Sequence, residues 1–267
     1  MDKKNKDKTP GFPAAEPDDL SSHAHRQLIG YIGLGMPLLL WLIAGFRPVT
    51  GLSPWQPLDS VSAYYYSGSV SAFAGILTAL ALFLFSYKGY DNKYRRRDRI
   101  AAIVAGCAAL LVAFFPVGAP PPFPAPPWWS QPIGLIHGIG AAILFSTFIF
   151  YCLFLFPRSS TKPGEPLPRD KQWRNGIYIF CGLGILGCMI WAIRAVSLGR
   201  PIFLPEAFAL EFFAVSWLVK GRAIPTAIYY GRHPKELAKD ALQALDAKPA
   251  PDQRPAVTGR KSARKGD

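Results

Sequence analysis

IGLIHGIGAAILFSTFIFYCLFLF, from Ile133 to Phe156, is the stretch of sequence that decides the fold. It contains no charged residue, and its apolar residues do not alternate with polar ones as they do in a transmembrane β-strand. A helix needs about 17 to 25 such residues to cross the ~30 Å hydrocarbon core of a membrane. The stretch therefore predicts a membrane-spanning helix.

Five other segments of the chain have the same apolar character. Backbone amides cannot bond to water inside lipid, so segments of this kind must be helical. The sequence therefore predicts an all-α, polytopic membrane protein whose six transmembrane helices form a compact bundle within residues 28–222. The five other segments run from Leu28 to Phe46, Ser69 to Tyr87, Ile100 to Phe115, Gly176 to Ile193 and Phe203 to Val219.

Both ends of the chain are hydrophilic. Residues 1–27 and 223–267 are rich in charged residues and proline, a composition that is typical of disordered tails. In the second tail, Leu237, Ala241 and Leu245 recur at fourfold spacing and predict a short amphipathic helix. We therefore expect a folded bundle between two tails.

Positive charge is distributed unevenly between the loops. The chain carries 30 Lys and Arg residues against 17 Asp and Glu residues. Apart from Arg47, Arg194 and Arg200, all of the basic residues fall near or within the two tails and the loops after the second and fourth spans. The positive-inside rule predicts that these segments and both termini are cytoplasmic, in a bacterial cytoplasmic (inner) membrane. Because the membrane topology accounts for the positive charge, we expect membrane lipids as partners. We do not expect the protein to bind nucleic acid.

The segment LDSVSAYYYSGSVSAFAG, from Leu58 to Gly75, brings polar residues to the outer start of the second span. Asp59, Ser60 or Ser62 can cap free backbone amides at a helix start, and the consecutive tyrosines suit the membrane interface. So many hydroxyl groups also suit a partly buried loop that faces a polar cavity. Both interpretations remain open from the sequence.

Three further polar residues fall inside the predicted spans. His137 lies roughly 7 Å inside the outer end of its helix, Glu206 lies near the outer interface, and Glu211 lies close to the bilayer centre. An acidic group at that depth is costly unless it is paired or protonated. It therefore indicates either a functional site or a hydrogen-bond clamp between helices. Because the connecting loop is short, Arg194 is expected to face Glu206.

These residues limit the chemistry that the protein can perform. A serine, a histidine and acidic residues are present, but the nucleophile elbow and the oxyanion-hole signature of a serine hydrolase are missing. Only one histidine lies within a predicted span, which disfavours a zinc or haem site. The sequence therefore predicts no metal and no cofactor.

Short motifs at matching places carry a resemblance to a known group of proteins. An Asp-Ser pair precedes the second span, SYKGYD follows it, FFP ends the third, IHGIGA opens the fourth and SWLVKG closes the sixth. With these landmarks the chain resembles uncharacterised bacterial six-span integral membrane proteins with a domain of unknown function. It also resembles, more faintly, the DRAM-like family of eukaryotic six-span proteins. The resemblance implies lipid handling or membrane regulation, and it implies site residues at Asp59, Ser60, His137 and Glu211.

The function expected from these features is the binding of a lipid or small amphiphile in an outward-facing polar pocket between the second, fourth and sixth spans. Two alternatives remain open. One is an intramembrane hydrolase or transferase in which His137 acts as the base and Asp59 or Glu206 orients it. The other is a membrane scaffold with no ligand. The candidate ligand-binding residues are Asp59, Ser60, Ser62, His137, Glu206 and Glu211.

Overall fold

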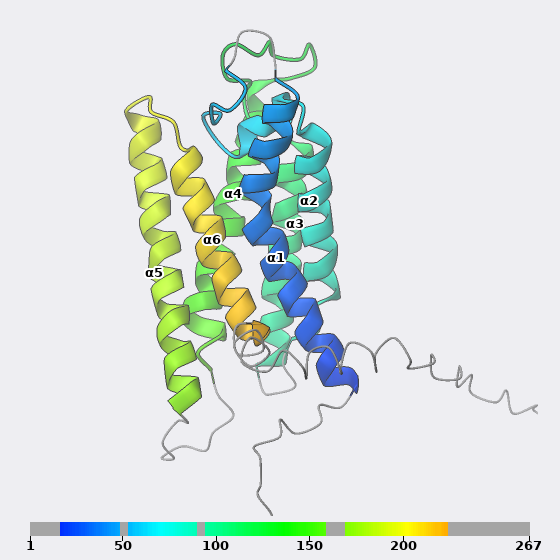
Figure 1. Cartoon of the computed structure of the whole chain (residues 1–267), viewed down its shortest axis with the longest axis vertical. Coiled ribbons are helices and arrows are strands. Elements are labelled where there is room, and N and C mark those ends of the chain that lie inside the picture. Colours follow the sequence, from blue (N-terminus) through cyan, green and yellow to red (C-terminus); the bar gives the residue numbers. More distant parts are fainter. Residues whose placement is uncertain (1–16, 49–52, 90–93, 159–168, 224–267) are drawn as a thin grey trace, which may run out of the picture. The chain divides into compact units, whose positions relative to one another are not determined.

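The structure is a computed structural model that describes residues 17–48, 53–89, 94–158 and 169–223. Figure 1 shows that these residues form helices joined by loops, and no strand occurs among them, which confirms the all-helical fold class. The predicted amphipathic helix of the second tail falls outside the described residues. The α-helices are α1 (Pro17–Phe46), α2 (Val70–Ser86), α3 (Arg95–Phe114), α4 (Gln131–Phe150), α5 (Arg169–Ser197) and α6 (Phe203–Lys220), with a 3₁₀ helix η1 (Ser62–Tyr66) and a π-helical turn η2 (Tyr151–Leu155).

Some helices begin before the predicted spans. Helix α1 begins at Pro17, ahead of Leu28, and α5 begins at Arg169, ahead of Gly176. Proline is tolerated in the first turn of a helix, and arginine and lysine favour helical backbone. The helix can therefore continue beyond the apolar segment, and the expected boundary between the first tail and the bundle moves toward the N-terminus.

Several of the helices have the length and composition of membrane spans. His23–Phe46, Gln131–Leu155 and Arg169–Ser197 are long and apolar enough to cross a membrane, and α2 is apolar but shorter. Helix α3 opens with the charged run RRRDR, which shortens its apolar part. This pattern is compatible with a membrane protein.

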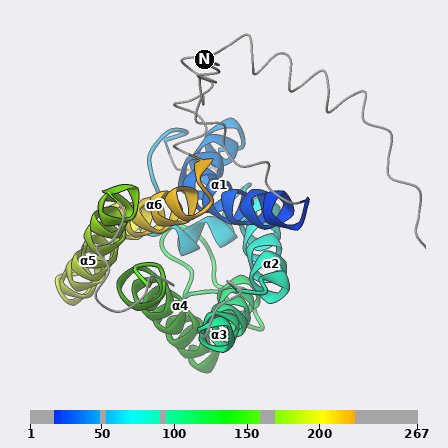
Figure 2. The same ribbon diagram turned by 90° about the horizontal axis from the view of Figure 1, so that it is seen from below.

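The six helices pack in a ring. Each helix contacts its neighbours in the chain, and α6 also packs against α1, which closes the ring. Figure 2 shows the six helices following one another around the ring in chain order. The ring belongs to the unit of the chain that ends at Pro225, and a second unit, Thr226–Asp267, lies outside the described residues.

Glycines allow the helices of the ring to approach closely. At Gly33 of α1, an added Cβ would lie 3.1 Å from the ring of Phe213 on α6. At Gly140 of α4, it would lie 2.8 Å from Cβ of Leu111 on α3. A side chain at either position would meet the neighbouring helix, so glycine permits the close packing of these helix pairs.

Aromatic side chains fill the ring at the end where α6 terminates. The Trp217 side chain is fully buried, and its ring centroid lies 5.2 to 5.4 Å from those of Tyr87, Tyr151 and Phe156. Closer to the middle of the bundle, the rings of Phe148 and Phe213 stack. A small cavity lies instead at the opposite end, beside η1, and its mostly apolar lining includes the polar side chains of Ser62 and Glu206.

Candidate functional site

The polar loop before α2 contains the 3₁₀ helix η1, and two of its serines bond locally. Ser60 Oγ accepts from a backbone amide of η1 at 2.9 Å, and Ser67 Oγ donates to a carbonyl of η1 at 2.8 Å. Ser69 Oγ donates to a carbonyl of α1 at 2.7 Å. These bonds explain much of the hydroxyl content of the loop as capping and anchoring. Ser62 differs, because its hydroxyl meets a side chain of α4.

His137 of α4 connects two segments that are distant in the chain. Its Nδ1 lies 2.7 Å from the carbonyl oxygen of Phe115, and its Nε2 lies 3.0 Å from Ser62 Oγ. A carbonyl can only accept, so Nδ1 carries a proton, and Nε2 of the neutral ring accepts from the hydroxyl of Ser62. His137 and Ser62 are both buried. The pair is therefore a defined Ser–His hydrogen bond shielded from bulk solvent.

Glu206, in the first turn of α6, bonds to the backbone that leads into η1. Its Oε2 accepts from the amide of Val61 at 2.7 Å. Nearby, the amide of Ile202 donates to the carbonyl oxygen of Asp59 at 2.6 Å. The expected pairing of Glu206 with Arg194 is wrong, because Arg194 is exposed and no ion pair joins these two described residues. Two hydrogen bonds thus fasten the start of α6 to the loop.

Aromatic residues of η1 hold it against the bundle. The ring of Tyr64, which is almost fully buried, lies 5.8 Å from that of Phe203 at the start of α6. The ring of Tyr66 lies 6.3 Å from that of Phe123 in the proline-rich loop. Burial raises the pKa of the Tyr64 phenol above its ordinary value, so its hydroxyl stays neutral at physiological pH. The segment is therefore a packed wall rather than a loose loop.

Ser62 and Glu206 line an interior cavity at this end of the bundle, called the chamber below. Its volume is about 30 Å³, enough for about two water molecules. Its lining is polar where η1 and α6 meet and apolar elsewhere. The other lining residues are Met36, Val61, Phe73, Leu77, Val112, Ala141, Leu144, Phe145 and Leu210.

Of the six predicted site residues, Ser62 and Glu206 line the chamber and the other four do not. Ser60 and His137 are buried, and His137 reaches the chamber only through its bond to Ser62.

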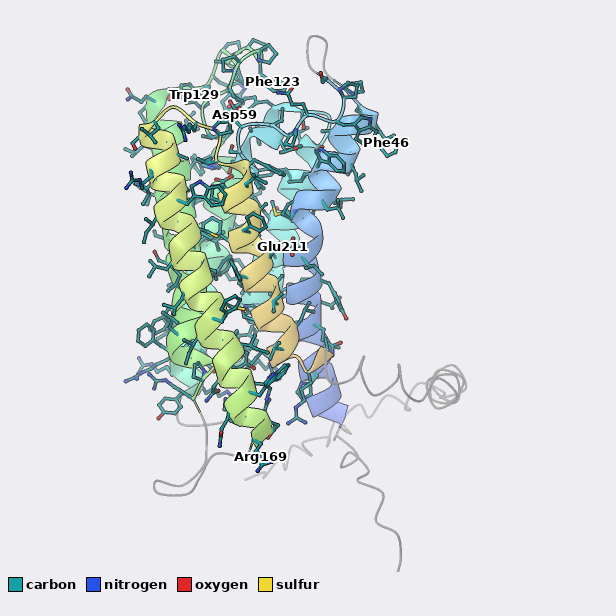
Figure 3. All side chains as sticks on the ribbon, turned by 60° about the vertical axis from the view of Figure 1, so that its left-hand side comes forward. Phe46, Asp59, Phe123, Trp129, Arg169 and Glu211 are labelled. Carbon is teal, nitrogen blue, oxygen red and sulfur yellow. The ribbon has the colours of Figure 1, made fainter. Side chains whose placement is uncertain are left out.

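The Asp59 side chain is exposed at the η1 end, whereas Glu211 lies about half-way along α6, as Figure 3 shows. Glu211 is half-buried, and no described residue forms a hydrogen bond with its carboxylate. It shares a helix face with Leu204 and Phe208, both exposed. The two acidic residues therefore do not belong to the chamber.

Backbone carbonyls form a part of the site that the side-chain pattern of the sequence does not predict. Three successive carbonyls after α3, beginning at Phe115, accept hydrogen bonds from side chains of other segments. The donors are His137, Trp129 and Tyr66. Pro116 cannot continue the helix, so carbonyls at its end need partners from elsewhere. The FFP motif is the signal that could have indicated them.

No metal cluster and no related protein adds to this description. Within the described part of the chain, no group of three His, Cys, Asp or Glu side chains is placed to hold a metal ion. Comparisons with protein-family models, with curated proteins and with solved structures found no match. The function must therefore be argued from the chemistry of the site.

Proposed function

We propose that this protein is a six-span membrane protein that binds a lipid or small amphiphile in the chamber. The chamber lies at the end of the bundle where α1 and α5 terminate and α6 begins, near Arg47, Arg194 and Arg200. Few basic residues occur at this end, so the positive-inside rule favours its placement on the outer side of a bacterial inner membrane. Both termini then face the cytoplasm.

The observation that carries the proposal is the mixed lining of the chamber. Glu206 offers a carboxylate, Ser62 offers a hydroxyl, and the remaining side chains are apolar. Ligand sites combine an apolar lining with a few polar groups that fix orientation. An amphiphile, with one polar end and an apolar chain, is the ligand class that matches such a lining.

The size of the chamber sets a condition on binding. Ligand pockets usually measure about 300 to 1,000 Å³, far more than the 30 Å³ of the chamber. Binding of such a ligand would therefore require the chamber to widen, which an outward movement of the wall formed by η1 would allow. The bonds that must break include those from Val61 to Glu206 and from Tyr66 to the carbonyl of Val117.

Native mass spectrometry of the full chain, purified in mild detergent, tests the proposal. We expect the wild type to retain a bound mass beyond the polypeptide. Glu206→Gln is expected to reduce this retention severalfold, because it replaces the carboxyl group, one of the two polar side chains in the lining, and a lost hydrogen bond costs about 0.5 to 1.5 kcal/mol. Glu211→Gln makes the same change on the same helix away from the chamber, so it is the matched control and should retain the ligand.

Two results would count against the proposal. If Glu206→Gln and Glu211→Gln reduced ligand retention equally, the ligand would not be bound in the chamber. If the wild type showed no bound mass, a membrane scaffold without a ligand would be the better explanation.

A second candidate function, that of an intramembrane hydrolase or transferase, is favoured by the bond between Ser62 and His137. The hydroxyl donates to Nε2, as a nucleophile does to its general base, and the Phe115 carbonyl fixes the ring tautomer. The oxygen of Ser62 would attack an acyl carbon while its proton passes to His137, which would then protonate the leaving group. Water or another acceptor would release the acyl group. A carbonyl thus orients the base, instead of Asp59 or Glu206 as expected from the sequence.

Labelling with a fluorophosphonate probe tests this second function. An activated serine should be modified at Ser62 in the wild type, and the modification should disappear in His137→Ala. Ser60→Ala removes a neighbouring hydroxyl that only caps η1, so this variant should still be labelled. An unlabelled wild type would argue against the hydrolase and transferase alike.

A further inference from the structure

A second cavity lies outside the chamber, in a groove between α3 and α4 at the opposite end of the bundle. Its volume of about 530 Å³ falls within the range of about 300 to 1,000 Å³ that is usual for ligand pockets. We call it the α3–α4 groove. Helix α3 contributes Arg97, Ile100, Ala101 and Val104, and helix α4 contributes Ala142, Ile143, Ser146, Thr147 and Phe150.

The walls of the groove are apolar and open to the surroundings. Ile100, Val104 and Ile143 expose 51%, 41% and 38% of their surface. The Thr147 hydroxyl is satisfied within its own helix, because Oγ1 donates to the carbonyl of Ile143 at 2.8 Å. On a helix bundle in a membrane, such a surface faces acyl chains, which are as apolar as the side chains themselves. The groove therefore suits a hydrocarbon chain.

The charged mouth of the groove limits the choice of occupant. Arg97 is exposed in the first turn of α3, beside the exposed Arg96 and Arg99. Asp98, the acidic residue of this run, is buried. An arginine pairs with a phosphate through two parallel hydrogen bonds, and basic residues at a membrane surface attract anionic lipids. The mouth is therefore complementary to a phosphate group.

We propose that the α3–α4 groove binds an anionic phospholipid of the adjacent leaflet, with an acyl chain along the apolar walls and the phosphate at Arg97. The occupant must be apolar over the length of the groove and anionic at its mouth, and a phospholipid meets both demands. A second copy of the chain or another membrane helix would match the walls but would leave Arg97 without a counter-charge. This site is separate from the chamber and does not depend on the function proposed for it.

The test compares two lipids of equal chain length. The full chain in detergent is titrated with phosphatidylglycerol or phosphatidylcholine, and the bound lipid is counted by native mass spectrometry. The wild type should prefer phosphatidylglycerol, and Arg97→Gln should reduce that preference about fivefold, which corresponds to one basic residue at the headgroup. Arg99→Gln is the matched control, because Arg99 belongs to the same basic run but does not line the groove. It should keep the preference.

A second pair of variants tests the groove itself. Ala142→Phe places a ring in the groove and should reduce the binding of both lipids, whereas Ile139→Phe enlarges an exposed residue of the same helix outside the groove and should not. If Arg97→Gln and Arg99→Gln reduced the preference for phosphatidylglycerol equally, the proposal would be overturned. The preference would then come from the overall positive charge of this end of the bundle. If Ala142→Phe instead alters the oligomeric state and leaves lipid binding intact, the groove binds a protein. Because Glu206 lies at the other end of the bundle, Glu206→Gln should leave this binding unchanged.

Discussion

At the scale of single residues, His137 is the centre of the candidate site. Both ring nitrogens are bonded, one to the end of α3 and one to η1. The same ring therefore has two roles: it connects three segments of the bundle, and it presents a basic nitrogen to Ser62. A test of the site must separate these roles.

The structural role of His137 predicts a measurable loss of stability. His137→Ala leaves the Phe115 carbonyl and the Ser62 hydroxyl without this partner. A buried polar group that loses its partner costs about 1 to 3 kcal/mol, so thermal unfolding in detergent should shift to lower temperature. Asp59→Asn changes an exposed carboxylate and should remain within about 0.5 kcal/mol of the wild type. Identical unfolding of His137→Ala and wild type would show that the two hydrogen bonds are absent.

The sequence predicted some members of the site and not others, for physical reasons. Ser62, His137 and Glu206 could be chosen because polar groups near one membrane face are expected to meet. Asp59 is predicted on the same ground, and Glu211 because an acidic group at the bilayer centre is costly, yet the one is exposed and the other lies outside the chamber lining. Which way a side chain turns depends on how the helices pack against each other. Helix packing is a property of the tertiary structure, and it cannot be deduced from a single sequence.

At the scale of helices, close packing of α3 and α4 depends on Gly140. A Cβ at this position would lie 2.8 Å from Leu111 Cβ and 3.3 Å from the carbonyl oxygen of Ala108, and neither atom can move independently of the backbone. Gly140→Ala should therefore lower the free energy of unfolding by about 1 to 3 kcal/mol. Gly138→Ala, on the same helix, meets no atom within 4 Å and should be neutral or slightly stabilising. Equal unfolding temperatures of the two variants would contradict this packing.

Helix α6 carries an acidic residue where a membrane would make it most costly. Glu211 lies near the middle of the helix, while Glu206 lies in its first turn. If α6 spans the membrane, Glu211→Leu should favour insertion of the isolated segment by about 2 to 3 kcal/mol, and Glu206→Leu should favour it less. Glycosylation mapping of the inserted segment measures both. An equal gain from the two variants would mean that Glu211 is not at the bilayer centre.

Helix positions were more predictable than helix ends. The apolar segments mark where each helix lies because lipid requires a helical backbone. They do not mark where a helix ends outside the apolar segment. Helix α5, for example, begins at Arg169, within a charged stretch. The end of α3 is an exception, since Pro116 sets it by removing a backbone donor.

At the scale of the whole bundle, the ring brings the chain's distant segments to one chamber. Contact of α6 with α1 closes the ring, and this contact places Glu206 beside η1. The apolar pattern predicts six helices but does not specify their neighbours, so the closure of the ring could not be predicted. The chamber depends on that closure, because its lining comes from α1, η1, α2, α3, α4 and α6.

The most direct test of the chamber is nuclear magnetic resonance of the protein with ¹⁵N-labelled histidine. His25 is a built-in reference, because its Nε2 lies 2.7 Å from the carbonyl oxygen of Phe83, and Phe83 belongs to the end of α2 remote from η1. Lipid extracted from the purified protein is added back to the delipidated chain. The chamber account predicts that the ring signals of His137 shift and those of His25 do not. An unchanged His137, or equal shifts at both residues, would contradict it.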